Sequence, residues 1–357
     1  MVLVNRRWLI LLIQSLFAIA IHLFLCIQPS RYKIFLMRFL VLTIGLLLFA
    51  AVSLAQKRQE IEYESDPVIK EKALRFMVFG DWGRNGEDNQ REVALEMGAI
   101  AKKFKPEFIV STGDNFYPNG VRSIRDHNWL ASYENIYTAQ SLQTDWYIVL
   151  GNHDYRGDPQ AEIDYTEVDR KWNMPARYYS KIFYIGDDST KGILFVFIDT
   201  TPFLSESYIG DKHHVKGQDT AIQRIWLEKT LRDAPANIKW KLVFGHHPVY
   251  TGGGRMKARE TTEMKALFQP IFEKYHVNAY ICGHDHNLQY IKPPGFTHYL
   301  VSGAGAELSR TVVHPEGGVF ARAENGFMNI SLYENQMQIR VISYKGEHLY
   351  SATIQRQ

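Results

Sequence analysis

Five short apolar runs in this chain end in a glycine, and the residue after each glycine is one that can bind a metal. The five residues are Asp81, Asp114, Asn152, His246 and His284. Short β-branched and aromatic runs bounded by glycine are typical of buried strands. In an open α/β sheet, ligands bind beyond the carboxyl ends of the strands. The repetition therefore predicts a metal centre at one sheet edge, where five oxygen and nitrogen donors would meet.

These donors belong to longer motifs that follow one another along the chain. The motifs are Gly80-Asp81-Trp82-Gly83, Gly113-Asp114-Asn115-Phe116-Tyr117, Gly151-Asn152-His153-Asp154, Gly245-His246-His247-Pro248 and Gly283-His284-Asp285-His286. In order and residue type, the set resembles the metallophosphoesterases of the calcineurin-like superfamily. More narrowly, it looks like the small, tartrate-resistant type of purple acid phosphatase. The resemblance covers residues 74–355, and the runs 282–290 and 302–305 are especially similar to that family.

The residue at position 83 distinguishes the purple subfamily from most other metallophosphoesterases. Most metallophosphoesterases carry a histidine ligand where this chain has Gly83. The purple subfamily instead uses a tyrosine three residues after the second aspartate, and Tyr117 stands at that position. A phenolate is a hard anionic oxygen donor, so it suits Fe(III) better than a soft divalent ion.

The resemblance implies two ions, Fe(III) and a second divalent metal (Fe, Zn or Mn). The implied ligands are Asp81, Tyr117 and His286 for Fe(III), Asn152, His246 and His284 for the divalent ion, and Asp114 as the bridge between them. Since His284 and His286 are two residues apart, on extended backbone they would share a face and reach neighbouring metals.

The same resemblance implies hydrolysis of phosphate monoesters, in which a hydroxide bound to the metals attacks phosphorus. His153 directly follows a ligand, so we expect it to stabilise the phosphoryl oxygens or protonate the leaving group. Asp154 could orient His153. Asn115 and Arg255 are candidates for substrate binding. Members of the family carry a further active-site histidine after the fourth motif, but this chain has no histidine between His247 and His276.

Two other functions remain open at this point. A phosphodiesterase or nucleotide-cleaving enzyme could use the same metal site, because the loops 115–145, 203–218 and 251–260 would decide the substrate. A non-catalytic protein that binds metal or phosphate is the alternative from another class, although every ligand position is intact. His213 and His214 could fold over the site in place of the missing histidine.

The hydrophobic pattern predicts an α/β fold, a four-layer αββα sandwich of two mixed β-sheets flanked by helices, as in metallophosphoesterases. We expect strands at 74–79, 107–112, 146–150, 193–198, 240–244, 279–282, 298–302, 327–332, 337–344 and 348–354. We expect helices at 88–104, 128–139, 165–172, 219–231 and 260–275. Residues 74–112 form a βαβ unit, which places both strand ends at the same edge.

The N-terminus differs from the body of the chain. The first 55 residues contain five Lys and Arg and no Asp or Glu, and removing them changes the formal net charge from +3 to −2. We interpret 1–36 as a hydrophobic extension, 37–55 as a signal-peptide-like segment, 56–73 as a linker and 74–357 as the catalytic domain. A retained membrane anchor is the alternative to cleavage. Either way we expect export, to the periplasm or the exterior.

The composition also bears on partners. The body has no basic patch that would indicate nucleic acid. We expect a monomer that acts on a small phosphate ester, with membrane contact only if the N-terminal segment is retained. Cys282 would be the one cysteine left after residue 55, which excludes an internal disulfide in that part of the chain.

Overall fold

The computed structural model describes residues 72–204, 208, 215, 217–308 and 312–357. The segments 1–36 and 37–55, most of the 56–73 linker, and His213 and His214 lie outside these residues, so their interpretation stays a prediction. Among the described residues, no helix is both long and apolar enough to cross a membrane.

The first sheet is mixed and has seven strands in the order β14-β13-β12-β1-β2-β3-β4. Strands β1 to β4 are parallel, and β12 to β14 add antiparallel strands beside β1. The bounds are β1 Leu74–Phe79, β2 Phe108–Ser111, β3 Asp145–Ile148, β4 Trp172–Asn173, β12 Gly326–Leu332, β13 Gln336–Ser343 and β14 His348–Gln355.

The second sheet also has seven strands, in the order β11-β9-β10-β8-β7-β6-β5. Strands β6, β7, β8 and β10 are parallel, while β5, β9 and β11 pair antiparallel at the sides. The bounds are β5 Tyr179–Tyr184, β6 Gly192–Phe197, β7 Ile238–Phe244, β8 Ala279–Cys282, β9 Leu288–Ile291, β10 His298–Ser302 and β11 Gly318–Arg322.

In the described part of the chain, four α-helices accompany the sheets: α3 Gln90–Phe104, α4 Pro159–Asp164, α6 Thr220–Arg232 and α7 Arg259–Lys274. Helix α6 begins where expected, because the Asp219 side chain accepts hydrogen bonds from the backbone N–H groups of Ala221 and Ile222. A π-helix spans Trp129–Glu134, and 3-10 turns span Gln140–Leu142, Asp154–Arg156, Tyr165–Glu167, Ile185–Asp187 and Thr201–Leu204.

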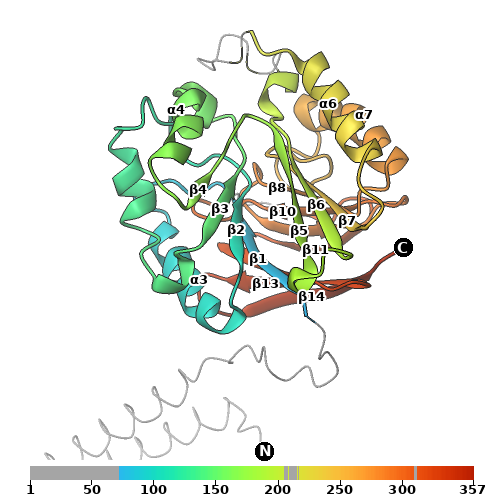
Figure 1. Ribbon diagram of the computed structural model, residues 1–357. Helices are drawn as coiled ribbons and strands as arrows, with labels where there is room; N and C mark the ends of the chain where they lie inside the picture. Colours follow the sequence, from blue (N-terminus) through green and yellow to red (C-terminus); the bar gives the residue numbers. More distant parts are fainter. Residues whose placement is uncertain (1–71, 205–207, 209–214, 216, 309–311) are drawn as a thin grey trace, which may run out of the picture. The chain divides into compact units, whose positions relative to one another are not determined.

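Three apolar interfaces hold these elements in four layers. Between the sheets, the Phe76 ring of β1 packs edge-on against Phe195 of β6, with ring centroids 5.1 Å apart. On the outer face of the second sheet, Phe272 of α7 stacks on Tyr280 of β8 at 5.1 Å. Helix α3 buries its apolar side in the core that it shares with the first sheet. Figure 1 shows α3 on one side and α6 and α7 on the other, so the expected αββα sandwich is confirmed.

Two local expectations were wrong. The segment 165–172 is not one helix, because the helical residues lie earlier, in α4 and the turn Tyr165–Glu167. Trp172 belongs to β4 instead, where its buried indole donates a hydrogen bond to the carbonyl oxygen of Glu162 at 2.8 Å. The segment 128–139 is helical only in part, at the π-helix. Strands β5, β9 and β11 were not predicted, since β9 has no clear alternation and β5 and β11 lie at the sides of the sheet.

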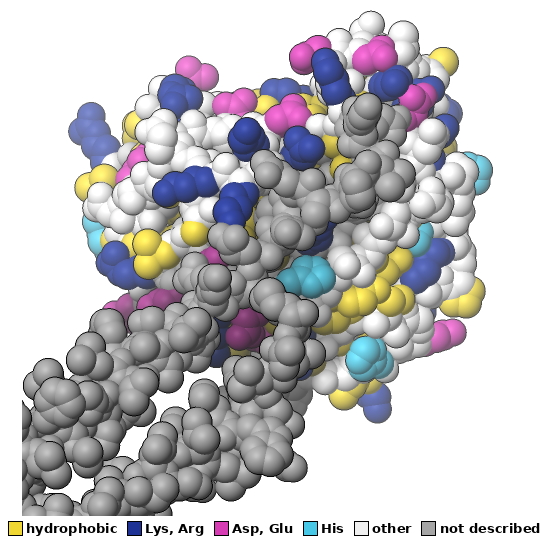
Figure 2. Space-filling model, turned by 90° about the horizontal axis from the view of Figure 1, so that it is seen from below, with side chains coloured by type: hydrophobic (Ala, Val, Ile, Leu, Met, Phe, Trp, Pro, Cys, Tyr) yellow, Lys and Arg dark blue, Asp and Glu magenta, His cyan; other side chains and the backbone are white. Residues whose placement is uncertain are grey.

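The surface agrees with the near-neutral charge of the body. On the face drawn in Figure 2, basic and acidic side chains of the described residues are interspersed. This mixture gives no support there for binding to a polyanion.

Candidate metal centre

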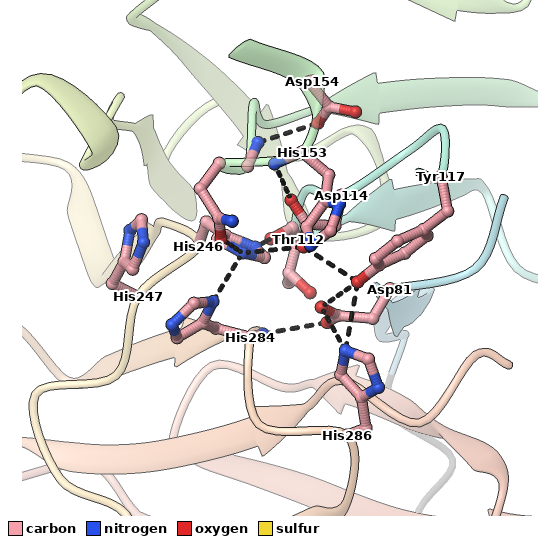
Figure 3. A network of polar contacts seen from close by, with 12 residues as sticks. Asp81, Thr112, Asp114, Tyr117, His153, Asp154, His246, His247, His284 and His286 are labelled. Atoms are coloured by element: carbon pink, nitrogen blue, oxygen red, sulfur yellow. Dashed lines mark hydrogen bonds and ion pairs between the residues drawn. The ribbon is translucent and has the colours of Figure 1, made fainter. Parts of the chain in front are cut away.

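The predicted donors come together from both sheets. Asp81, Asp114 and Asn152 follow β1, β2 and β3 of the first sheet, whereas His246 and His284 follow β7 and β8 of the second. The expectation of one sheet edge was therefore wrong, because the packed sheets bring two sets of carboxyl ends together. Hydrogen bonds join the two sheets here: the His284 backbone N–H donates to Asp81 Oδ2 at 2.9 Å, and His246 Nδ1 lies 2.9 Å from the Thr112 carbonyl oxygen (Figure 3).

The backbone turns sharply at three of these residues. Asp81, Asp114 and His284 have φ angles of 60°, 49° and 68°, in the left-handed region that residues other than glycine seldom occupy. Such conformations persist where the surroundings enforce them, and they are frequent at functional sites. His284 is therefore not on extended backbone, contrary to the expectation, and the turn sends His284 and His286 to different neighbours.

Glycine permits the close approach of the two sheets at the site. Gly113 has a φ of 95°, and a Cβ at this position would lie 2.8 Å from His246 Nδ1. A side chain there would push His246 out of its place. The glycine before the second aspartate is thus required by both its backbone conformation and its contact across the sheets.

One group of donors surrounds the Tyr117 hydroxyl. Its oxygen lies 3.0 Å from Asp81 Oδ1, 2.8 Å from Asp114 Oδ2 and 3.0 Å from His286 Nε2. Burial and the two carboxylates hold the pKa of Tyr117 well above its usual range, so the phenol keeps its proton when only protein groups surround it. A bound cation of high charge would reverse this preference, because it favours the phenolate.

A second group of donors surrounds His246 Nε2. This atom lies 3.2 Å from Asn152 Oδ1, 3.1 Å from His284 Nδ1 and 3.4 Å from Asp114 Oδ2. Since the Thr112 carbonyl oxygen can only accept, His246 Nδ1 carries a proton and Nε2 faces the other donors. Burial would lower the pKa of His246, but the Asp114 carboxylate raises it to about 9, so a positive charge is favoured here. Burial holds the pKa of His284 well below its usual range.

Asp114 belongs to both groups. Its Oδ2 contacts the Tyr117 hydroxyl and His246, and its Oδ1 accepts a hydrogen bond from the His153 backbone N–H at 2.7 Å. The carboxylate is buried, yet the charges of His246 and His153 outweigh that burial and lower its pKa well below the usual value. Ligand atoms of Asp81, Asp114 and His246 lie within 4.8 Å of one another. This donor set fits two cations that share one carboxylate.

His247 also lies beside the second group but is already engaged. Its Nδ1 is 2.8 Å from Thr200 Oγ1, and its Nε2 is 2.6 Å from the Tyr208 hydroxyl. Although His246, His247 and His284 are close enough to hold an ion, a metal on His247 would displace one of these hydrogen bonds. Asn152 can complete a set of three metal donors with His246 and His284, and no hydrogen bond of His247 is then lost.

His153 lies at the rim of the site, and its partner differs from the expected one. Its Nδ1 is 2.8 Å from the Pro118 carbonyl oxygen, so Nδ1 carries the proton. Asp154 does not contact the imidazole. Its carboxylate instead accepts hydrogen bonds from the backbone N–H groups of Gly151, Asn115 and Phe116, at 2.8, 2.8 and 3.1 Å. Asp154 therefore ties together the loops after β2 and β3.

The two candidates for substrate binding have different surroundings. The buried Asn115 amide donates to the Val149 carbonyl oxygen and to Glu162, both at 2.9 Å, so its surroundings do not support contact with a substrate. Arg255 lies beside His284, with Nη1 3.1 Å from the His284 carbonyl oxygen. Its guanidinium is partly exposed and also pairs with Asp285 at 3.2 Å.

Sequence reasoning missed two residues at the site. Arg84 places its guanidinium 3.8 Å from the centroid of the Tyr117 ring. Glu260 contacts His284 Nε2 at 3.0 Å. Neither belongs to a motif, and only the position of Glu260 in the segment that lacks a histidine could have drawn attention to it.

The comparison with known families agrees with this geometry. Residues 74–288 match the family described as calcineurin-like phosphoesterase. The chain belongs to this family. Its relatives place the phosphoesterase among the purple acid phosphatases. It is 34% identical to purple acid phosphatase 4 of Arabidopsis thaliana, over 85% of this chain and 91% of that protein. It is 30% identical to human tartrate-resistant acid phosphatase type 5, over 80% of this chain and 91% of that protein.

Solved structures have the same fold as this phosphoesterase. One is GAP50, described as the anchor in the inner membrane complex of Plasmodium, with 26% identity, a TM-score of 0.68, and coverage of 80% of this chain and 90% of that one. Another is the purple acid phosphatase PPD1 from yellow lupin seeds, with 15% identity, a TM-score of 0.59, and coverage of 81% of this chain and 55% of that one. The expected family and fold are thereby confirmed.

Proposed function

We propose that this phosphoesterase hydrolyses phosphate monoesters at a dinuclear metal centre that contains Fe(III) and a divalent ion. The observation that carries the proposal is the position of Asp114, whose carboxylate contacts both the Tyr117 hydroxyl and His246 Nε2. One carboxylate thereby joins a group that consists mainly of oxygen donors to a group of imidazole and amide donors. The names of the relatives, purple and tartrate-resistant acid phosphatases, support the same activity.

The chemistry of the donors supports one assignment of the ions. Asp81, Tyr117 and His286 would hold Fe(III), since two of the three are hard anionic oxygens. Asn152, His246 and His284 would hold the divalent ion, each of them uncharged once His246 gives up its extra proton to the metal. Asp114 would bridge them. When bound, the two ions supply an activated water and bind the phosphoryl oxygens.

The protein itself would position the substrate and hold a proton. The Pro118 carbonyl oxygen fixes the His153 ring through Nδ1–H, so Nε2 is the nitrogen that would gain and lose a proton near a leaving group. Burial lowers the pKa of His153, so this proton would be held at acidic pH. Arg156 Nη1 lies 3.2 Å from His153 Nδ1, and its charge adds to the attraction for a phosphate. Arg255 supplies a second fixed positive charge beside His284, although Asp285 and Glu260 partly balance it.

We further propose that the protein is exported. A positive stretch, an apolar run and small residues before position 56 support export to the periplasm or the exterior. We propose a monomer whose substrate is a small phosphate ester.

The test compares a nitrophenyl phosphate monoester with the corresponding bis-nitrophenyl diester, across pH 4–9, on purified and metal-loaded protein. Faster cleavage of the monoester is expected. Faster cleavage of the diester would instead assign a phosphodiesterase with the same metal centre. Two bound metals with no turnover of either ester would instead assign a binding role.

A further inference from the structure

The carboxylate of Glu260 contacts His284, one of the proposed metal ligands, at the ring nitrogen that faces away from the other donors. Its Oε1 lies 3.0 Å from His284 Nε2, and the two side chains are only 14% and 3% exposed. Glu260 stands in the first turn of α7, and it comes from the segment between His247 and His276, which contains no histidine. The contact is therefore buried and joins α7 to the turn after β8.

The contact decides which nitrogen of His284 carries a proton. A carboxylate accepts hydrogen bonds, so Nε2 donates its proton to Glu260. The other nitrogen, Nδ1, then has a free lone pair. It lies 3.1 Å from His246 Nε2, on the side where the donors of the divalent site converge. Without the carboxylate, the proton could move to Nδ1 and block that lone pair.

Glu260 is itself held in place from two other segments. Its Oε1 pairs with Arg255 Nε at 3.0 Å, and its Oε2 accepts a hydrogen bond from the Tyr208 hydroxyl at 3.2 Å. The first turn of a helix also favours a negative charge through its unpaired N–H groups. With these partners, the carboxylate has little freedom to turn away from His284.

We infer that Glu260 is a positioning residue for the divalent-metal site: it holds the proton of His284 on Nε2 and directs Nδ1 at the metal. This inference rests on the proposed dinuclear centre. Partners of this kind orient a histidine ligand and make it more basic, and their loss weakens metal binding about 10–100-fold. The polar partners of Glu260 are His284, Arg255 and Tyr208, and none of them is a proposed iron ligand, so the iron site should not depend on it.

The test titrates Zn²⁺ into the iron-loaded full chain and into the variant Glu260→Ala. We expect Zn²⁺ to bind about 10–100-fold more weakly to the variant, with the visible iron–tyrosine colour unchanged. Glu260→Gln, which keeps the size and one acceptor oxygen, should lose less affinity than Glu260→Ala. The matched control is Glu263→Ala, one turn later on α7, because Glu263 pairs with Arg259 rather than with a histidine.

Two results would overturn the inference. Equal Zn²⁺ affinity of the Glu260→Ala and Glu263→Ala chains would show that Glu260 does not act on the site. Should Glu260→Ala fold poorly, Glu260→Leu replaces it, because leucine fills a similar volume and offers no acceptor to His284 Nε2. Unchanged Zn²⁺ affinity of a folded Glu260→Leu chain would count against the inference. If His284→Ala also leaves Zn²⁺ binding intact, the proposed metal centre itself fails, and the inference fails with it.

Discussion

The Tyr117 hydroxyl lies 3.0 Å from His286 Nε2, although 169 residues separate the two in the sequence. Tyr117 follows β2 in the first sheet, and His286 follows β8 in the second. This half of the site therefore exists only when the two sheets are packed. Since metal binding to such a site is coupled to folding, a bound ion should stabilise the packed sheets.

Tyr117→Phe should abolish the visible colour of the iron-loaded protein, because the phenolate oxygen would be gone while the buried ring stays. The fold should be retained, since the aromatic packing is unchanged. The measurement is an absorption spectrum of the loaded variant beside that of the unaltered chain. A visible band of unchanged position and strength would exclude Tyr117 as a ligand.

Asp114→Asn should remove metal from both positions, because a neutral amide of the same size lacks the charge that both groups of donors share. Losing several kcal/mol of charge stabilisation in the transition state corresponds to a rate loss on the order of 10³. Metal content and monoester turnover are the readouts, with the exposed Asp164→Asn as the control. Full metal content and activity in Asp114→Asn would refute the bridging role.

Asp154→Ala should destabilise the protein by about 3 kcal/mol or more, because three backbone N–H groups would lose their shared acceptor in a buried place. The loops after β2 and β3 carry Asp114 and Asn152, so metal affinity should fall as well. Urea unfolding of the metal-free chains gives the free energy of unfolding. A loss below about 1 kcal/mol would mean that these loops do not depend on Asp154.

Because of Asp199, the free energy of unfolding should decrease as the pH rises from about 4 to 7. Burial raises the pKa of Asp199 from its ordinary value of 3.8 to about 7, even though the Tyr155 hydroxyl, Arg177 and His246 act in the other direction. In this window the folded chain keeps the proton and the unfolded chain has lost it, so each pH unit costs up to about 1.4 kcal/mol.

The variant Asp199→Asn cannot titrate, so it should lack this loss. Melting temperatures of both chains at pH 5 and pH 7 measure the difference. The stability of the unaltered chain relative to the variant should decrease between the two pH values. A constant difference would show that the pKa of Asp199 is not raised in the folded protein.

The sequence predicted the donors better than their arrangement. Asp81, Asp114 and Asn152 could be found because each follows a strand and a glycine, which is a local pattern. That the other two donors come from a second sheet depends on packing between distant segments, so the local pattern placed all five at one edge. The partner of His153 was also predicted wrongly, because the Pro118 carbonyl oxygen belongs to the backbone and leaves no signal in residue type.

The helices and strands show the same difference between features set by local sequence and features set by packing of distant segments. Helix α6 was predicted closely because Asp219 caps it and its apolar spacing is regular. Trp172 was assigned to a helix because its place in β4 depends on a buried tryptophan and tyrosine cluster that forms only in the folded chain. Glu260 was missed for the same reason, since only the position of α7 brings it to His284.

The most direct test of the dinuclear centre is an anomalous-diffraction map of a crystal of the protein loaded with iron and zinc, with data collected at both absorption edges. We expect two peaks, one on each side of the Asp114 carboxylate, with iron beside Tyr117 and zinc beside His246 and His284. A single peak, or a metal bound by His247 in place of Asn152, would contradict it.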